Sequence, residues 1–189
     1  MSNLDALYKE ITRSHPTPEY IEKQLHPIPD TKAVNRVEFI VSQCKGKKVL
    51  DIGSSGFLRG ILKPICELTG IDKQATSDIQ CDVEKDPMPD GEFELIVAGE
   101  ILEHLSNPGM FLDNLKKYSC PIIITVPNAF SDNSGRTGIE NVNPEHVAWY
   151  SYNTLKTLME RHGYEVTEWY WQHGQPYTAE GLIFVVRRK

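Results

Sequence analysis

The sequence lacks long apolar runs: no stretch approaches the 20 or so consecutive apolar residues that a membrane-crossing helix needs. The first residues, MSNLDALYKEITRSHP, are polar and mixed in charge, so they also lack the apolar core of a secretory signal peptide. We therefore expect a cytoplasmic protein without membrane contacts.

Basic clusters are scarce as well. The net charge is −6, and the strongest basic group is the short tail at 187–189. Proteins that bind duplex nucleic acid carry a basic surface that neutralises phosphates. Duplex nucleic acid is therefore disfavoured as a partner, while a single nucleotide end stays open.

The cysteines show no metal-binding spacing. Cys44, Cys66, Cys81 and Cys120 form no C-x-x-C pair. This pattern disfavours a structural zinc site and favours reduced, mostly buried thiols.

The length of 189 residues suits one main domain with a sizeable core. Residues 1–34 are rich in proline and histidine and show no strand pattern, so they are predicted to be an N-terminal helical cap segment over a pocket mouth. Residues 35–189 are predicted to be the functional domain.

Strand and helix patterns alternate along this domain. Predicted helices cover 31–43, 57–66, 111–118 and 152–163, and predicted strands cover 49–52, 68–72, 77–83, 93–99, 121–128, 164–171 and 181–188. This alternation predicts an α/β fold of the Rossmann-like, doubly wound type. Its sheet is expected to have seven strands, most of them parallel. The last two strands are joined by a segment too short for a crossover helix, so a hairpin with an antiparallel final strand is expected.

The segment VLDIGSSG, residues 49–56, carries the first motif. A buried strand runs into a turn in which Gly53 and Gly56 allow a tight bend and close approach to a ligand. Backbone N–H groups and the following helix would offer donors to a carboxylate or phosphate. Asp51, just before the turn, suits a cationic ligand. An ordinary strand–helix turn is the simpler alternative.

Two further acids follow later predicted strands. Asp72 lies 21 positions after Asp51, a spacing typical of an acid that binds ribose hydroxyls, and it does not separate nicotinamide cofactors from S-adenosylmethionine. Asp82 could accept a bond from an adenine amino group while the Val83 backbone donates one. A solvated turn acid is the alternative at both positions, and it explains Asp82 as well as the adenine role does, whereas for Asp72 the ribose role is favoured.

The segment GEILEHLSNP, residues 99–108, begins at the carboxyl end of a predicted strand. If it is helical, Glu100, Glu103 and His104 converge on one turn, and His104 is a candidate general base. His146 follows a long polar loop of the kind that often carries a substrate site. Packing or capping roles for these side chains remain the alternative.

Taken together, VLDIGSSG, GID, CDVE, FELIVAGEILEHL, ITVPN and HVAWYS resemble, in order and spacing, the class I S-adenosylmethionine-dependent methyltransferases. The branch with ubiquinone-type and small-molecule O-methyltransferases is the most similar. The resemblance covers roughly residues 35–189 and also implies the antiparallel final strand.

The resemblance implies a role for each matching residue. The loop Gly53, Ser54, Ser55 and Gly56 would hold the methionine part of S-adenosylmethionine, and Asp51 would anchor its amino group. Asp72 would bind the ribose, Asp82 and Val83 the adenine, and Glu100 would lie near the sulfonium. One departure stands out: Ser55 and Phe57 occupy positions where the family usually has glycine.

A second resemblance concerns Glu100, Glu103, His104 and His146, which are similar to the metal-binding set of small-RNA 3′-terminal 2′-O-methyltransferases. Two carboxylates and two imidazoles suit Mg²⁺, Mn²⁺ or Zn²⁺. The resemblance thus implies a possible divalent metal beside S-adenosyl-L-methionine, with His104, His146 and Glu103 as catalytic candidates.

The function predicted is methyl transfer to a hydroxyl or amine of a small-molecule acceptor. The alternatives are a metal-dependent 2′-O-methyltransferase that acts on an RNA 3′ end, a nicotinamide-dependent oxidoreductase, and a non-catalytic cofactor-binding module. The turn GSSGFLRG differs from G-x-G-x-x-G, which speaks against the oxidoreductase. The sequence does not fix the oligomeric state.

Overall fold

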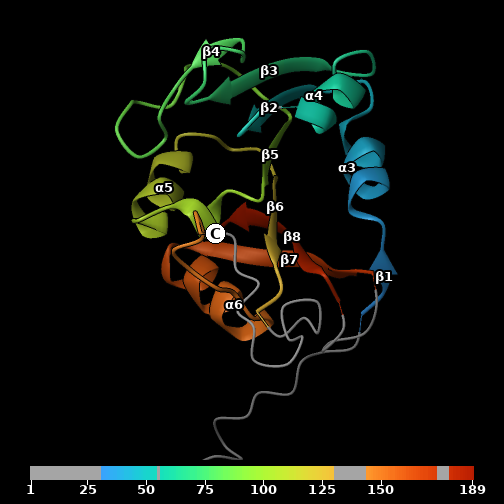
Figure 1. Cartoon of the computed structure of the whole chain (residues 1–189), viewed down its shortest axis with the longest axis vertical. Coiled ribbons are helices and arrows are strands. Elements are labelled where there is room, and N and C mark those ends of the chain that lie inside the picture. Colours follow the sequence, from blue (N-terminus) through green and yellow to red (C-terminus); the bar gives the residue numbers. More distant parts are fainter. Residues whose placement is uncertain (1–30, 55, 130–143, 174–178) are drawn as a thin grey trace, which may run out of the picture. The chain divides into compact units, whose positions relative to one another are not determined.

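Strand β2 (Lys48–Ile52) lies inside an eight-stranded sheet with the order β1-β7-β8-β6-β5-β2-β3-β4 (Figure 1). The computed structural model describes residues 31–54, 56–129, 144–173 and 179–189. The other strands are β1 (Ala33–Val34), β3 (Glu67–Asp72), β4 (Ile79–Gln80), β5 (Leu95–Gly99), β6 (Ile122–Pro127), β7 (Tyr164–Gln172) and β8 (Gly181–Arg188). The helices are α3 (Arg36–Cys44), α4 (Gly56–Leu62), the 3₁₀ turn η1 (Leu102–His104), α5 (Pro108–Leu115) and α6 (Tyr152–Arg161).

The central strands are buried apolar runs. Every residue of β2 after Lys48 is buried, as are the residues of β5 before Gly99 and those of β6 before Pro127. Strands covered on both faces show this continuous pattern, and β2, β5 and β6 pair in parallel, as predicted.

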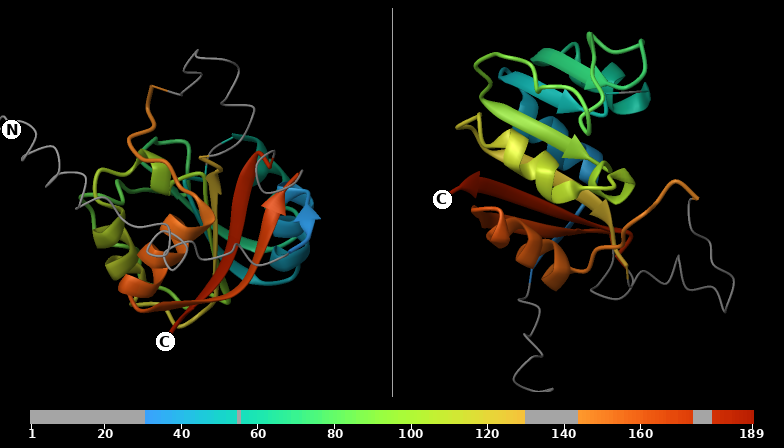
Figure 2. Two further views of the ribbon diagram at one scale, coloured as in Figure 1. Left: turned by 90° about the horizontal axis from the view of Figure 1, so that it is seen from below. Right: turned by 90° about the vertical axis from the view of Figure 1, so that its left-hand side faces the viewer.

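Helices cover both faces of the sheet. Figure 2 shows α3 and α4 on one side of the strands and α5 and α6 on the other. On the first side Ile40 and Cys44 of α3 and Leu62 of α4 pack against Val49 in one buried cluster. The predicted doubly wound α/β fold is confirmed.

The carboxyl-terminal strands break the parallel pattern. Strand β8 pairs antiparallel with both β6 and β7, so the predicted antiparallel final strand is confirmed. An eighth strand, β1, pairs in parallel with β7 and was not predicted. Its residues Ala33 and Val34 were expected to belong to the helix 31–43. The helix instead begins at Arg36, and Asn35 caps its N-terminus by accepting the Glu38 N–H with its side chain.

Other boundaries also differ from the prediction. The expected helix 57–66 ends at Leu62, before Pro64, and the expected strand 77–83 is reduced to Ile79–Gln80. Residues Thr31–Lys189 form one compact unit. Residues 1–30 of the predicted cap segment lie outside the described residues.

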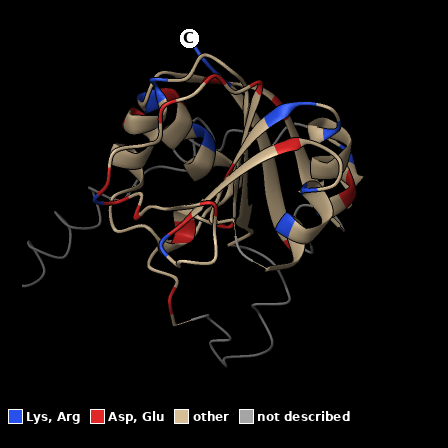
Figure 3. Cartoon of the chain, turned by 90° about the horizontal axis from the view of Figure 1, so that it is seen from above, with Lys and Arg blue, Asp and Glu red and all other residues tan. Residues whose placement is uncertain are grey.

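The surface carries charges of both signs. Figure 3 shows Lys and Arg interspersed with Asp and Glu over the described residues, without a continuous basic stripe. Among the helices of this part of the chain, none has the length and apolar character required to cross a membrane.

A charged clamp joins α4 to the β3 edge. Arg59 donates to both carboxylate oxygens of Asp78, at 2.8 and 2.5 Å, and Asp78 also accepts the Gly70 N–H at 2.7 Å. Arg59 lies 3.3 Å from the Ser54 hydroxyl. These bonds tie the turn after β2 to β3. They require a glycine at 70, because a Cβ there would lie 2.2 Å from the Arg59 guanidinium and 2.4 Å from the Ser54 oxygen.

Gly70→Ala is expected to lower the free energy of unfolding by about 1–3 kcal/mol, the usual cost of overpacking. Gly60→Ala is the matched control, because a Cβ at this helical position meets nothing within 4 Å. The control should be neutral or slightly stabilising, since alanine is the better helix former. Urea unfolding of both variants measures the difference, and equal stability would refute the clamp.

Candidate functional site

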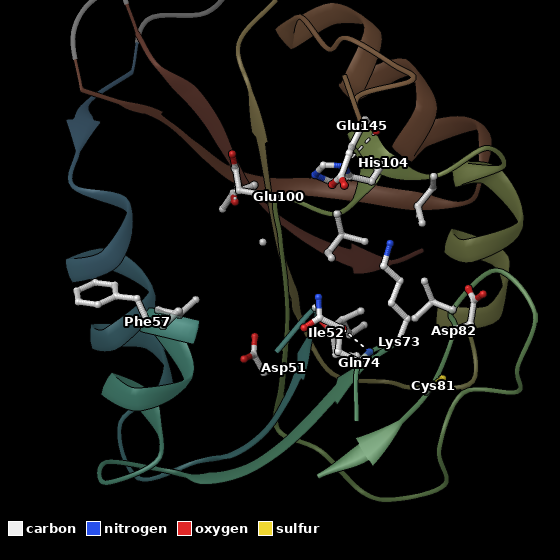
Figure 4. A pocket seen from close by; sticks show the side chains of 18 of the residues that line it. Asp51, Ile52, Phe57, Lys73, Gln74, Cys81, Asp82, Glu100, His104 and Glu145 are labelled. Atoms are coloured by element: carbon white, nitrogen blue, oxygen red, sulfur yellow. Dashed lines mark hydrogen bonds between the residues drawn. The ribbon is translucent and has the colours of Figure 1, made fainter. Parts of the chain in front are cut away.

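One cavity of about 460 Å³ opens where β2, β3, β4 and β5 end (Figure 4). Strand β2 lies between β3 and β5, and the chain leaves these strands toward opposite sides of the sheet. Open α/β sheets bind ligands at such a switch point. The wall includes the predicted residues Asp51, Gly53, Asp72, Asp82, Val83, Glu100 and His104, together with Arg36, Phe57, Lys73, Gln74, Thr125 and Glu145.

The turn after β2 is held by β3. The N–H groups of Gly53 and Ser54 both donate to the Ile71 carbonyl, at 2.9 and 3.0 Å. These two donors are therefore used within the protein, contrary to the expectation that they face a ligand. Gly53 has φ +75, and a Cβ would lie 2.2 Å from Ile101, so only glycine fits beneath that side chain.

Asp51 brings a buried carboxyl to the cavity, with 3% of its surface exposed. Burial raises its pKa from 3.8 to about 6, against opposing contributions from the Ser54 hydrogen bond and the Arg59 charge. A buried acid without a cation beside it is costly, and a ligand ammonium group would relieve that cost.

The end of the cavity at β3 and β4 carries two acids that are more exposed than Asp51. Asp72 accepts the Gln74 N–H at 2.7 Å and lies at the end of β3. Asp82 accepts the Glu84 N–H and pairs with Lys85 at 2.6 Å, which lowers its pKa. The turn role considered for Asp82 is thus real, although the residue also lines the cavity beside the buried Val83.

Glu84 connects two loops of the wall. Its carboxylate accepts the N–H groups of Ser106 and Asn107 at 2.7 and 3.2 Å. These two hydrogen bonds hold the loop after β4 against the loop after η1, and they stabilise that side of the cavity.

Glu100 occupies a strained backbone position, with φ 55. Its N–H donates to the Thr125 carbonyl at 2.9 Å, and its carboxylate accepts the Thr125 hydroxyl and pairs with Arg36, both at 2.8 Å. Non-glycine residues hold such a conformation only where surrounding contacts impose it. Arg36, from α3, thereby reaches across to the end of β5.

His104 lies on η1 with its ring facing the cavity. Its Nδ1 is 3.2 Å from the Glu145 carbonyl oxygen. A carbonyl can only accept, so Nδ1 carries a proton, and in the neutral imidazole Nε2 is then the nitrogen with the lone pair. His146 packs edge-to-face against His104, with ring centroids 4.7 Å apart. Burial and the neighbouring His104 lower the pKa of His146.

Glu103 lies behind this pair and is 1% exposed. Among the residues that the structure describes, neither of its carboxylate oxygens has a hydrogen-bond partner, and burial raises the pKa of Glu103 to about 8. Ligand atoms of Glu103, His104 and His146 lie within 4.8 Å of one another. An orphaned buried carboxylate beside two imidazoles fits a divalent metal ion.

Glu100 does not join this group, although the sequence placed it among the four metal ligands. Arg36 and Thr125 hold its carboxylate, although its charge still acts on Glu103 and on His146. The 3₁₀ turn η1 begins only at Leu102, so Glu100 precedes it, and a shared metal site of Glu100 with Glu103, His104 and His146 stays a prediction.

The remaining residues of the predicted cofactor loop lie in different environments. Ser54 is buried against Arg59, Gly56 begins α4 with φ 64, and Ser55 lies outside the described residues. Among residues not predicted, Arg36 and Thr125 gave no motif signal. Arg36 lies in a segment with a helical pattern and Thr125 in an apolar strand. Only the tertiary fold brings these two residues to Glu100.

Comparisons with known proteins agree with this geometry. The model of a family described as a methyltransferase domain matches residues 23–168. No curated protein matches the chain.

Several solved structures share the fold. The N-methyltransferase NodS from Bradyrhizobium japonicum WM9, in complex with S-adenosylhomocysteine, is 19% identical, with a TM-score of 0.57 and coverage of 96% of this chain and 97% of that one. The magnesium protoporphyrin IX methyltransferase from Synechocystis PCC 6803, with bound S-adenosylhomocysteine, is 12% identical, with a TM-score of 0.60 and coverage of 96% and 100%. The 1,6-didemethyltoxoflavin-N1-methyltransferase from Burkholderia thailandensis is 14% identical, with a TM-score of 0.60 and coverage of 81% and 76%.

Asp51→Asn tests the cost of the buried acid. A raised folded-state pKa means that the fold disfavours the ionised form, so the penalty appears as pH rises from about 4 to 6 and is complete at pH 7. The variant should be more stable than wild type by about 1–3 kcal/mol at pH 7.5, and the gain should shrink near pH 4.5. Urea unfolding at both pH values measures it. A variant that is less stable at pH 7.5 would contradict the assignment.

Proposed function

Because the chain belongs to the methyltransferase domain family, we propose that it moves the methyl group of S-adenosylmethionine to a hydroxyl or amine of a small-molecule acceptor. The observation that carries this proposal is the cavity at the switch point, into which acids from the ends of β2, β3 and β5 open. A cationic amino acid joined to a nucleoside matches such a lining.

The adenosine would lie along β3 and β4. Asp72 accepts the ribose hydroxyls, and the adenine rests by Asp82 and Val83. Asp82 keeps its bonds to the Glu84 N–H and to Lys85. Its carboxylate would accept the adenine amino group with a lone pair that these bonds do not use. Val83 is buried and supplies an apolar contact.

The methionine part would lie between β2 and α3. Asp51 faces the ammonium, whose charge compensates the buried carboxylate. The carboxylate of the methionine needs a donor, and the Gly53 and Ser54 N–H groups are taken by Ile71. Arg36 is the cation that lines this part of the cavity. We assign it to the methionine carboxylate, with Glu100 then free to face the sulfonium.

The reaction is an in-line displacement. The acceptor oxygen or nitrogen forms a bond to the methyl carbon while the carbon–sulfur bond breaks, leaving S-adenosylhomocysteine. Nε2 of His104 takes the acceptor proton, because in the neutral imidazole this nitrogen has the lone pair while Nδ1–H donates to the Glu145 carbonyl. His146 and Glu103 position this imidazole. The sulfonium is already activated, so the protein contributes mainly by bringing the reactants together.

The comparisons and the charge pattern support a small acceptor. The toxoflavin and protoporphyrin enzymes named above act on small molecules, and this chain has a net charge of −6, with Lys and Arg scattered among Asp and Glu in the view of Figure 3. A divalent metal ion remains a proposed second cofactor. Where bound by the His104 cluster, it would lower the pKa of an acceptor hydroxyl.

Asp72→Ala should weaken S-adenosylhomocysteine binding by about 1–3 kcal/mol, because hydrogen bonds from the ribose to a charged group are lost. Titration calorimetry measures the change. Asp90→Ala is the control, because that carboxylate is fully exposed and pairs with Lys117 away from the cavity. An unchanged dissociation constant for Asp72→Ala would remove this residue from the site.

His104→Ala should lower turnover by about 100-fold or more, the usual effect of losing a general base, with S-adenosylhomocysteine affinity nearly intact. The assay follows isotopically labelled methyl groups from S-adenosylmethionine into a panel of small hydroxyl and amine acceptors. His162→Ala, which alters a histidine paired with Asp113, should keep its activity. A large loss of cofactor affinity in His104→Ala would refute the assigned role, and no transfer to any acceptor by wild type would favour a non-catalytic binding module.

A further inference from the structure

Phe57, on the first turn of α4, places an exposed aromatic ring at the cavity. The residue is 75% exposed, and no other large apolar side chain among the described residues is as exposed. It belongs to the cavity wall, whereas the exposed Val147 and Trp149 do not. Single exposed apolar residues are common on an open surface, but a ring at a cavity offers area that a bound ligand can cover. The methyl transfer described above gives this ring no role.

The contacts that fix α4 leave the Phe57 ring outside the core. Leu58 packs against the buried cluster of α3 and β2, and Leu62, on the same face of the helix four positions later, belongs to that cluster. Arg59 is held by Asp78 in the clamp to the β3 edge. The helix is therefore fixed by residues other than Phe57, and the protein interior does not use the ring.

The ring lies at the end of the cavity that faces α3. Arg36 and Ile40 of α3 line the same cavity as Phe57. Figure 4 shows the ring on the side of α3 and α4, apart from the His104 end. The proposed function places the methionine part of the cofactor at the α3 end, with Arg36 at its carboxylate and Asp51 at its ammonium.

The methionine part also carries an aliphatic chain between its charged groups and the sulfur. Ile40 and Ile52, each 1% exposed, offer apolar contacts to this chain from the buried side of the cavity. Phe57 offers one from the open side. When an aliphatic chain and an aromatic ring cover each other, both lose apolar surface to water contact, and this burial stabilises the complex.

We propose that Phe57 packs over the aliphatic chain of the methionine part and so selects ligands that carry the amino-acid tail. The proposal rests on the proposed function and adds a specificity-determining residue to it. A glycine, which the family usually has at this position, would offer the chain no contact area. Phe57 therefore favours S-adenosylmethionine and S-adenosylhomocysteine over nucleosides without the tail, such as 5′-methylthioadenosine.

The test compares two ligands on the full chain. S-adenosylhomocysteine carries the amino-acid tail, and 5′-methylthioadenosine lacks it but keeps the adenosine and the sulfur. Phe57→Ala should weaken S-adenosylhomocysteine binding about tenfold, as expected when most of the burial of a phenylalanine side chain is lost, and should change 5′-methylthioadenosine binding less than about twofold. Titration calorimetry measures the first ligand, and competition against labelled S-adenosylhomocysteine measures the second.

Three further variants separate this role from a general effect on the cavity. Phe57→Leu keeps apolar area and should bind S-adenosylhomocysteine within about threefold of wild type. Asp72→Ala removes a ribose contact that both ligands share, so it should weaken both. Met110→Ala truncates an exposed side chain of α5 outside the cavity wall and should weaken neither. Urea unfolding should show the same stability for Phe57→Ala and wild type, because the ring is exposed.

Three results would overturn the proposal: S-adenosylhomocysteine binding unchanged in Phe57→Ala, an equal loss of both ligands in that variant, or a loss in Phe57→Leu as large as that in Phe57→Ala. The wild-type titrations separate this proposal from the proposed function. S-adenosylhomocysteine binding by wild type with an equal affinity in Phe57→Ala defeats the role of Phe57 alone. Absence of S-adenosylhomocysteine binding by wild type defeats both.

Discussion

The position of β2 between β3 and β5 is the constraint on which the remaining structure depends. From β2 the chain goes to β3 and β4 on one side, and it returns to place β5 and β6 on the other. The loops that follow β2 and β5 must therefore separate, and the space between them is the cavity. Each functional group is placed by the strand whose carboxyl end it follows.

The site concentrates features that cost stability. Asp51 and Glu103 are buried acids with raised pKa values, and Glu100 holds a left-handed backbone conformation. The nearby apolar core of α3, α4 and β2 offsets this cost. Strain and shifted pKa values cluster at functional sites, and a cationic ligand would offset the cost of the two buried acids.

The features that depend on local sequence patterns were predicted from the sequence. Buried apolar runs identified β2, β5 and β6. The acids predicted near the carboxyl ends of β2, β3 and β5, namely Asp51, Asp72 and Glu100, do line the cavity. The short final connection predicted the antiparallel β8. These succeeded because strand periodicity and connection length act over few residues.

Features set by distant contacts were not predictable. Strand β1 forms because Ala33 and Val34 pair with residues of β7 far along the chain, which outweighs the helical pattern there. The left-handed backbone of Glu100 and its bonds to Arg36 and Thr125 likewise arise from packing. A sequence pattern places Glu100 on the same turn as Glu103, whereas tertiary contacts separate them.

The central claim is that the cavity at the switch point holds S-adenosylmethionine. Titration calorimetry of the wild-type chain with S-adenosylhomocysteine, beside NADH as a comparator of similar adenosine chemistry, tests it most directly. The account predicts one-to-one binding of S-adenosylhomocysteine with about 8 kcal/mol, a micromolar dissociation constant, and much weaker binding of NADH. Absence of S-adenosylhomocysteine binding, or tighter binding of NADH, would contradict it.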